Sequence, residues 1–187
     1  MQRSLHGPVF AGLIMDMDLK QQLMEKKPAI LKKWFDAVAD TYPENTSGFL
    51  KKQKAQFTNP VGYTLAEGLD GLFDALLKGM IPDTVKTLLD GIVRIRAIQE
   101  FTPSEAVAFI FQLKNIVRQE LGNEILHLPG MTDQLAAFDS TIDDLALFAF
   151  DIYMKCREKI FELKAKEATN MTFRLLQQAR IIVDGQD

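Results

Sequence analysis

Very few side chains in this sequence are of the types that carry out catalysis or bind metal ions. The chain has two histidines, His6 and His127, and one cysteine, Cys156. A zinc site needs such ligands in clusters, and none is present. Cys156 falls on an apolar helical stripe where no basic side chain is forced against it, which predicts a buried, unreactive thiol. We therefore expect no catalytic residue, no metal site and no cofactor, and interpret the chain as a non-enzymatic protein.

Haem is the one cofactor that the expected order of helices would suit. A globin-type fold holds the iron with a histidine from the helix before its last two long helices, here within residues 85–100. That stretch contains no histidine, cysteine or tyrosine. His127 falls instead in the loop between the last two predicted helices. We predict that the chain binds no haem.

Two arginines, Arg94 and Arg96, fall beside the apolar face of a helix predicted to begin at Pro82. They are candidates for contacts to a small anion at the mouth of a pocket, with ordinary salt bridges as the alternative. The sequence also has 13 phenylalanines and 8 methionines. Such side chains either fill a core or line a plastic apolar cavity. These observations leave open a small-molecule-binding module with an apolar interior pocket.

Composition and charge fit one globular domain outside the membrane. The 187 residues are 47% hydrophobic and 25% charged, which is typical of globular proteins. The net charge of −3 provides no basic surface for nucleic acid. No window reaches the ~18 apolar residues needed to cross a bilayer, and one cysteine indicates a reducing compartment. We predict a cytoplasmic protein with no nucleic-acid partner and no membrane insertion, in which residues 1–15 form a flexible tail before one domain over 16–187.

Helix signals recur along the whole chain, and no strand pattern is present. Capping residues and first-turn prolines mark where the helices begin, and glycines or further prolines mark where they end. Helices are predicted from Asp16 or Asp18 to about Lys26, from Pro28 to Pro43, over 47–56, from Asn59-Pro60 to Gly79, from Pro82, from Thr102-Pro103 to Leu121-Gly122, and over 132–180. The expected fold class is all-α, with a globin-like or bundle-like order ending in a long helix.

The last predicted helix is too long for the domain that contains it. Residues 132–180 would span roughly 70 Å at ~1.5 Å per residue, whereas a domain of this size is about 40 Å across. The helix must therefore project or bend, with Thr169-Asn170 as the expected weak point because it has the poorest helix formers. Its apolar stripe comprises Leu135, Phe138, Ile142, Leu145, Phe148, Ile152, Cys156, Ile160 and Leu163, and continues at Ala168, Met171, Leu175, Ala179 and Ile182.

An apolar stripe that leaves the domain must be covered by another helix. We therefore predict that residues 165–187 form a projecting helix end, and that Met171, Leu175, Ala179 and Ile182 form an interface. A homodimer is the simplest arrangement that would cover them. An unknown regulatory protein is the other candidate partner.

A set of residues in the first half of the chain follows a pattern found in a known family. The pattern consists of Trp34, Tyr42, Pro43, Phe57, Asn59, Pro60 and Gly62. It resembles the RsbRD N-terminal domain family, the sensor halves of RsbT co-antagonists in stressosome-type regulators of bacterial sigma factors. The resemblance covers roughly residues 17–165. It implies a non-haem globin-like fold, dimerisation, and a signal passed along a C-terminal helix to an output domain.

The same residues also have structural explanations. Tyr42-Pro43 ends a helix, Asn59-Pro60 begins one, and Gly62 permits a close approach in the first turn of that helix. The STAS output domain of such regulators has no counterpart after the long helix, so we expect the output to pass through this chain's own surface.

Three functions remain open from the sequence. The leading interpretation is a sensory or regulatory module that works through protein–protein contacts. The alternatives are a small-molecule-binding module and an accessory subunit of a redox or energy-conserving complex.

Overall fold

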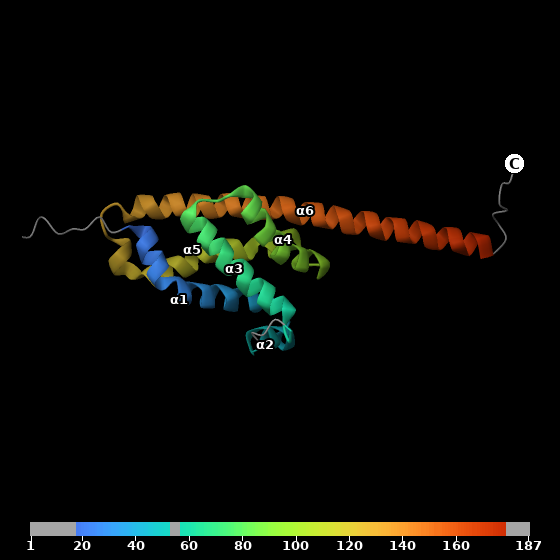
Figure 1. The fold of residues 1–187 in the computed structure, drawn as a ribbon, viewed down its shortest axis with the longest axis horizontal. Helices are drawn as coiled ribbons and strands as arrows, with labels where there is room; N and C mark the ends of the chain where they lie inside the picture. Colours follow the sequence, from blue (N-terminus) through green and yellow to red (C-terminus); the bar gives the residue numbers. More distant parts are fainter. Residues whose placement is uncertain (1–17, 53–56, 179–187) are drawn as a thin grey trace, which may run out of the picture.

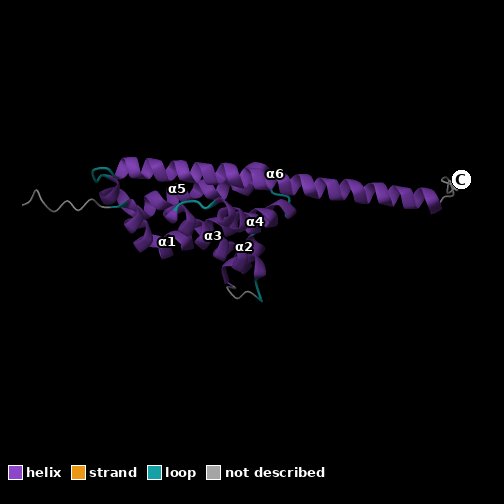
Figure 2. Ribbon diagram, turned by 45° about the horizontal axis from the view of Figure 1, so that its top comes forward, coloured by secondary structure: helices purple, strands orange, loops and turns teal. Residues whose placement is uncertain are grey.

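The structure is a computed structural model that describes residues 18–52 and 57–178. These residues form six helices and no strand, which confirms the predicted all-α fold class. The helices are α1 (Leu19–Ala39), α2 (Glu44–Lys52), α3 (Pro60–Lys78), α4 (Pro82–Ile98), α5 (Pro103–Leu126) and α6 (Met131–Gln178). Helix α6 lies along the whole body and extends far beyond it (Figure 1). Apart from the connecting loops, every described segment is helical (Figure 2).

The core is built where α1 and α6 pack on opposite sides of α5 and its neighbours. Helix α6 contacts α4 and α5 most extensively, and α1 contacts α3 and α5. Trp34 of α1 is fully buried, and its indole Nε1 donates a hydrogen bond to the backbone carbonyl of Phe109 at 2.7 Å. The rings of Trp34 and Phe109 stack with their centroids 6.2 Å apart. Trp34 thus joins α1 to the centre of α5.

The two helices predicted before residue 43 are one continuous helix, with Pro28 in its interior. A proline there removes one backbone hydrogen bond and costs about 3 kcal/mol. Leu23, Ile30 and Trp34 lie on both sides of Pro28 and are all fully buried. Burying each such side chain contributes about 1.5–3 kcal/mol, so packing of the whole face outweighs the cost of the proline. The prediction of a break at Pro28 was wrong for this reason.

The connection into α3 confirms the predicted roles of Asn59, Pro60 and Gly62. The buried Asn59 side chain accepts a hydrogen bond from the Gly62 backbone N–H at 2.8 Å and donates one to the Leu50 carbonyl at 3.3 Å. A Cβ atom on Gly62 would lie 2.1 Å from the Asn59 amide nitrogen. Asn59 therefore caps α3 and fastens it to α2, and only glycine fits at residue 62.

The connection between α4 and α5 contains a strained residue followed by a strong helix start. Glu100 has φ 62°, in the left-handed region, which costs a non-glycine residue roughly 1–2 kcal/mol. The next residues form the predicted capping box, in which Thr102 and Glu105 satisfy each other's backbone N–H groups. The helical backbone of α5 is interrupted at Gly122, which has a φ of 74°, and this confirms the predicted helix end near Leu121-Gly122; a further short helical stretch then leads to Leu126. Residues 97–102 are called the α4–α5 corner below.

Replacing Glu100 with glycine is expected to raise the free energy of unfolding by about 1 kcal/mol, because glycine adopts positive φ without strain. Glu100→Ala is the matched control: it also loses the exposed ion pair of Glu100 with Lys164 but keeps the strain. Chemical denaturation followed by circular dichroism measures both variants. Equal stabilities of the two variants would show that residue 100 stores no backbone strain.

Helix α6 projects and does not bend. It is continuous through Thr169 and Asn170, and the Thr169 hydroxyl donates to the carbonyl of Ala165 at 3.0 Å. All residues from 161 to 175 are exposed. The row of α6 that faces the core therefore ends at the half-buried Ile160, and the predicted inclusion of Leu163 in that row was wrong.

Candidate functional site

Exposed apolar side chains recur along a face of α6 that the body leaves uncovered. They are Leu147, Phe150, Met154, Phe161, Met171 and Leu175, between 41% and 70% exposed. Their spacings of three, four, seven, ten and four residues all fit one heptad pattern, in which the exposed Ala168 occupies one of the intervening positions. Such a pattern is typical of a helix that pairs with another helix. We call Leu147, Phe150, Met154, Phe161, Ala168, Met171 and Leu175 the outer row.

The first part of the outer row lies beside α5. Helices α5 and α6 run antiparallel and are joined by the ion pairs Lys114–Asp143, at 2.6 Å, and Arg118–Asp139. Phe111 is 44% exposed and lies one turn before Lys114. Leu147 lies one turn after Asp143, so the two apolar side chains are at the same level of the helix pair. Phe111 thus widens the apolar surface on the α5–α6 face.

The α4–α5 corner binds α6 through three contacts at the point where α6 leaves the body. We call these contacts, made by Tyr153, Arg157 and Lys164, the clamp. The Tyr153 hydroxyl donates to the carbonyl of Phe101, and Arg157 Nη1 donates to the carbonyl of Ala97 at 3.1 Å. Further along, Lys164 Nζ lies 3.2 Å from a carboxylate oxygen of Glu100. Arg157 and Lys164 occupy positions of the heptad pattern but bond to the body. This explains why the outer row has wider gaps there, and it makes the clamp part of the candidate site.

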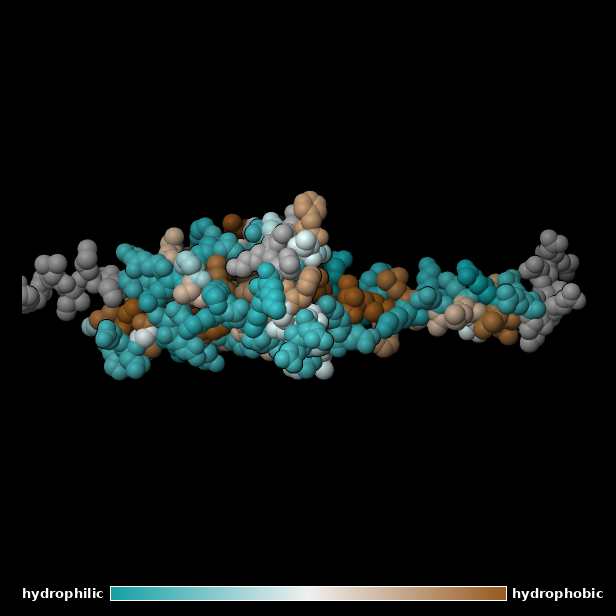
Figure 3. Space-filling view, turned by 90° about the horizontal axis from the view of Figure 1, so that it is seen from below, coloured by the Kyte–Doolittle hydropathy of each residue, from teal (hydrophilic) through white to brown (hydrophobic). Residues whose placement is uncertain are grey.

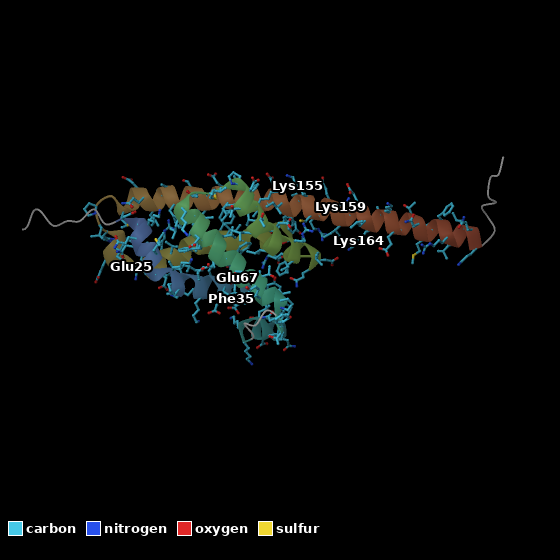
Figure 4. All side chains as sticks on the ribbon, viewed as in Figure 1. Glu25, Phe35, Glu67, Lys155, Lys159 and Lys164 are labelled. Carbon is cyan, nitrogen blue, oxygen red and sulfur yellow. The ribbon has the colours of Figure 1, made fainter. Side chains whose placement is uncertain are left out.

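The space-filling view shows how apolar and polar side chains are distributed on one face of the molecule. Apolar surface is present on α6 just beyond the body and again near the end of the described helix (Figure 3). The same helix carries charged side chains such as Lys155, Lys159 and Lys164, which are labelled along it in Figure 4. A mixed surface of this kind is expected of a helix that pairs along one stripe and meets water elsewhere.

Behind the corner lies a buried guanidinium surrounded by aromatic rings. Arg96 is 0% exposed, and its Cζ lies 4.2 Å from the ring centroid of Phe101 and 5.6 Å from those of Tyr42 and Phe109. Its Nη1 and Nη2 donate to the Thr41 hydroxyl at 3.1 Å and to the Glu105 carbonyl at 2.9 Å. We call Arg96, Tyr42, Phe101 and Phe109 the arginine cage. The cage connects the end of α1, the end of α4 and the start of α5.

The arginine cage contains incompletely satisfied polar groups. Within the described residues, Arg96 Nε and the Tyr42 hydroxyl have no hydrogen-bond partner, and no carboxylate forms an ion pair with Arg96. Burial raises the pKa of Tyr42 and lowers the pKa of Arg96. The interaction between these two side chains shifts each pKa in the opposite direction but does not outweigh burial. Cation–π contacts with three desolvated rings, each worth up to about 2 kcal/mol, offset part of the cost of burying the charge.

The two arginines singled out from the sequence do not form an anion pocket together. Arg96 lies inside the core. Arg94 is on the surface and makes a two-pronged contact with Asp90, with Arg94 Nη2 at 2.8 Å from one carboxylate oxygen and 3.1 Å from the other. For Arg94 the salt-bridge alternative is the one observed. For Arg96 neither alternative holds, because aromatic rings take the place of an anion.

The remaining side chains that could bind metal or react, Cys156 and His127, do not gather into one site either. Cys156 is half-buried and not fully buried as predicted, and this partial burial raises the pKa of its thiol. Glu124 and His127 have the Glu-x-x-His spacing of a bundle metal ligand pair, a signal that the sequence reading missed. No group of three His, Cys, Asp or Glu side chains within residues 18–52 and 57–178 is placed to hold a metal ion.

The residues of the family pattern divide into internal and external ones. Trp34 lies in the core and Tyr42 in the arginine cage, while Phe57 is 99% exposed. Of the predicted interface, Met171 and Leu175 are exposed on the projecting part of α6. Ala179 and Ile182 lie outside the described residues, as does the predicted tail over 1–15. No helix of the described segments is long and apolar enough to cross a bilayer.

Parts of this chain are similar to known proteins. An uncharacterised protein of Archaeoglobus fulgidus is 31% identical over 103 residues, which cover 53% of this chain and 64% of that protein. The chain therefore spans less than two thirds of that relative. No solved structure is similar enough to count as a match. Residues 28–168 match the RsbT co-antagonist protein rsbRD N-terminal domain, a stretch that begins within α1 and includes the arginine cage, the α4–α5 corner and most of the outer row. The chain therefore belongs to the RsbRD N-terminal domain family.

Proposed function

We propose that this chain is a non-enzymatic, cytoplasmic sensory module that works as a homodimer with a globin-like body and signals through protein contacts. Membership of the family implies a stressosome-type regulatory sensor domain. The observation that carries the proposal is the outer row, which continues from the body onto the projecting part of α6. Exposed apolar stripes of this length are seldom left in water by monomeric proteins.

A second copy of the chain is the partner that best fits the outer row. A two-fold dimer brings the same patch of both subunits together, and the row of each copy would cover that of the other. From Leu147 to Leu175 the row is roughly 42 Å long at ~1.5 Å per residue. Near the body it is widened by Phe111. A paired α5–α6 face, continued by paired projecting helices, would bury apolar surface of both copies along this whole length.

The clamp at the α4–α5 corner supplies a route by which the body influences the projecting helix. Phe101 belongs to both the arginine cage and the clamp, because its ring packs on Arg96 and its carbonyl accepts from Tyr153. A shift of the corner would change three contacts of α6 at once. Since α6 is a continuous helix, its far end would move with its base.

Deleting residues 165–187 is expected to weaken association by at least about 10-fold, because Ala168, Met171 and Leu175 are removed while the α5–α6 face remains. Light scattering coupled to size-exclusion chromatography, over a range of concentrations, measures this. The full chain is expected to show twice its mass of 21.1 kDa.

A full-length chain that stays monomeric at all concentrations would overturn the homodimer. Unchanged association after the deletion would place the interface wholly on the body.

A further inference from the structure

A large cleft lies between α1, α2 and α3, and α5 and α6 contribute nothing to its lining. Its volume is about 700 Å³, within the range of about 300–1,000 Å³ that small-molecule sites occupy. Leu31 and Phe35 of α1, Leu50 of α2 and Leu69 of α3 supply apolar walls. Because the outer row is on other helices, the cleft stays open when that row is covered.

The charged groups around the cleft favour a cation. Lys32 pairs with Asp36 at 2.9 Å, and Lys51 pairs with Asp40 at 2.6 Å. Each of these lysines is therefore already neutralised by a carboxylate. Glu67 also lines the cleft, and it forms no ion pair or hydrogen bond with the described residues. Glu67 is exposed, and its carboxylate has no cationic partner within the described residues.

A second free polar group lies next to Glu67. Tyr63 lines the cleft one turn earlier on α3, and its hydroxyl has no hydrogen-bond partner within the described chain. Side chains four residues apart on a helix are neighbours, so a carboxylate, a hydroxyl and an aromatic ring are available together. Phe35 of α1 and Glu67 of α3 lie in the same part of the body, far from the projecting end of α6 (Figure 4).

We propose that this cleft binds an organic ammonium ion with an apolar or aromatic body. The ammonium group donates hydrogen bonds to the Glu67 carboxylate and the Tyr63 hydroxyl, and the apolar body packs on Phe35 and Leu69. An anionic ligand of the same shape would meet Glu67 unpaired, which disfavours it. The assignment of this ligand as the input to the sensor rests on the proposed function, whereas binding itself does not.

Isothermal titration calorimetry of the full chain with phenylbutylammonium tests the proposal, with phenylpentanoate as the probe of opposite charge. We expect the ammonium ion to bind with a Kd on the order of 0.1–1 mM. The carboxylate should bind at least about 10-fold more weakly. Glu67→Gln should weaken ammonium binding about 10-fold, because a charge-assisted hydrogen bond becomes a neutral one.

Two tryptophan substitutions provide a matched pair. Ala66 is exposed and lines the cleft, so Ala66→Trp should abolish binding by filling it. Ala29 is an exposed alanine of α1 outside the lining, and Ala29→Trp should bind as the wild type does. Thermal unfolding verifies that both variants fold.

Three outcomes would overturn the proposal: no ammonium binding, equal binding of the two probes, or binding that survives Ala66→Trp. Light scattering on the same samples separates this inference from the proposed function. A dimer without ligand binding refutes the cleft assignment alone, and a monomer that binds the ammonium ion refutes the dimer alone.

Discussion

Replacing Phe150 with glutamate is expected to convert the proposed homodimer into a monomer. Phe150 belongs to the outer row at the level of the body, where α5 and α6 together form the apolar face. In a two-fold dimer the substitution places two carboxylates in one interface, each without a partner. Burying one uncompensated charge costs several kcal/mol. We expect the dissociation constant of the dimer to rise by at least about 100-fold, which corresponds to about 2.7 kcal/mol.

Sedimentation velocity or light scattering at several concentrations measures this change. Phe173→Glu is the matched control, because Phe173 lies on the same helix and is 48% exposed but falls outside the outer row. It should leave association nearly unchanged. If Phe173→Glu dissociates the protein and Phe150→Glu does not, the interface lies on the opposite side of α6.

Replacing Arg96 with alanine is expected to lower the free energy of unfolding by about 3–5 kcal/mol. The substitution leaves a cavity among the rings of the arginine cage and removes every contact that Arg96 makes between α1, α4 and α5. Arg96→Met should stay within about 1 kcal/mol of the wild type. Methionine fills a similar volume and removes an unsatisfied buried Nε–H together with its charge.

Arg96→Ala and Arg96→Met can be compared because the two groups that accept hydrogen bonds from Arg96 are also held by other parts of the structure. The Thr41 hydroxyl also donates to the carbonyl of Val38 at 2.7 Å, and the Glu105 carbonyl belongs to the first turn of α5. Urea denaturation measures both variants. If Arg96→Met costs as much as Arg96→Ala, the charge itself stabilises the cage, and cation–π attraction outweighs the cost of burying it.

Much of the helical framework could be predicted from local signals. Thr102 and Glu105 form a capping box because both partners are three residues apart in the chain. Asn59 caps α3 for the same reason, and its buried contact with Leu50 adds to a start already specified locally. Where the local signal conflicted with packing, at Pro28, packing decided the outcome.

The candidate interaction surface was predicted in part. The spacing of apolar residues predicted that another helix would pack on the end of the last helix. Met171 and Leu175 are exposed there. Periodicity did not show that α6 has two apolar rows, because it cannot tell which row meets the body. Only the placement of α4 and α5 shows that Cys156 faces inwards and Phe150 outwards.

The scarcity of catalytic and metal-ligand residue types, the all-α class and the excess length of the final helix were determined by the sequence itself. Each depends on residue types or on spacings within one helix. The arginine cage, the clamp on α6 and the cleft beside Glu67 were decided by tertiary structure. Arg96 is 55 residues from Thr41, and Tyr153 is 52 from Phe101. Contacts over such separations depend on how the helices pack, and no local pattern records them.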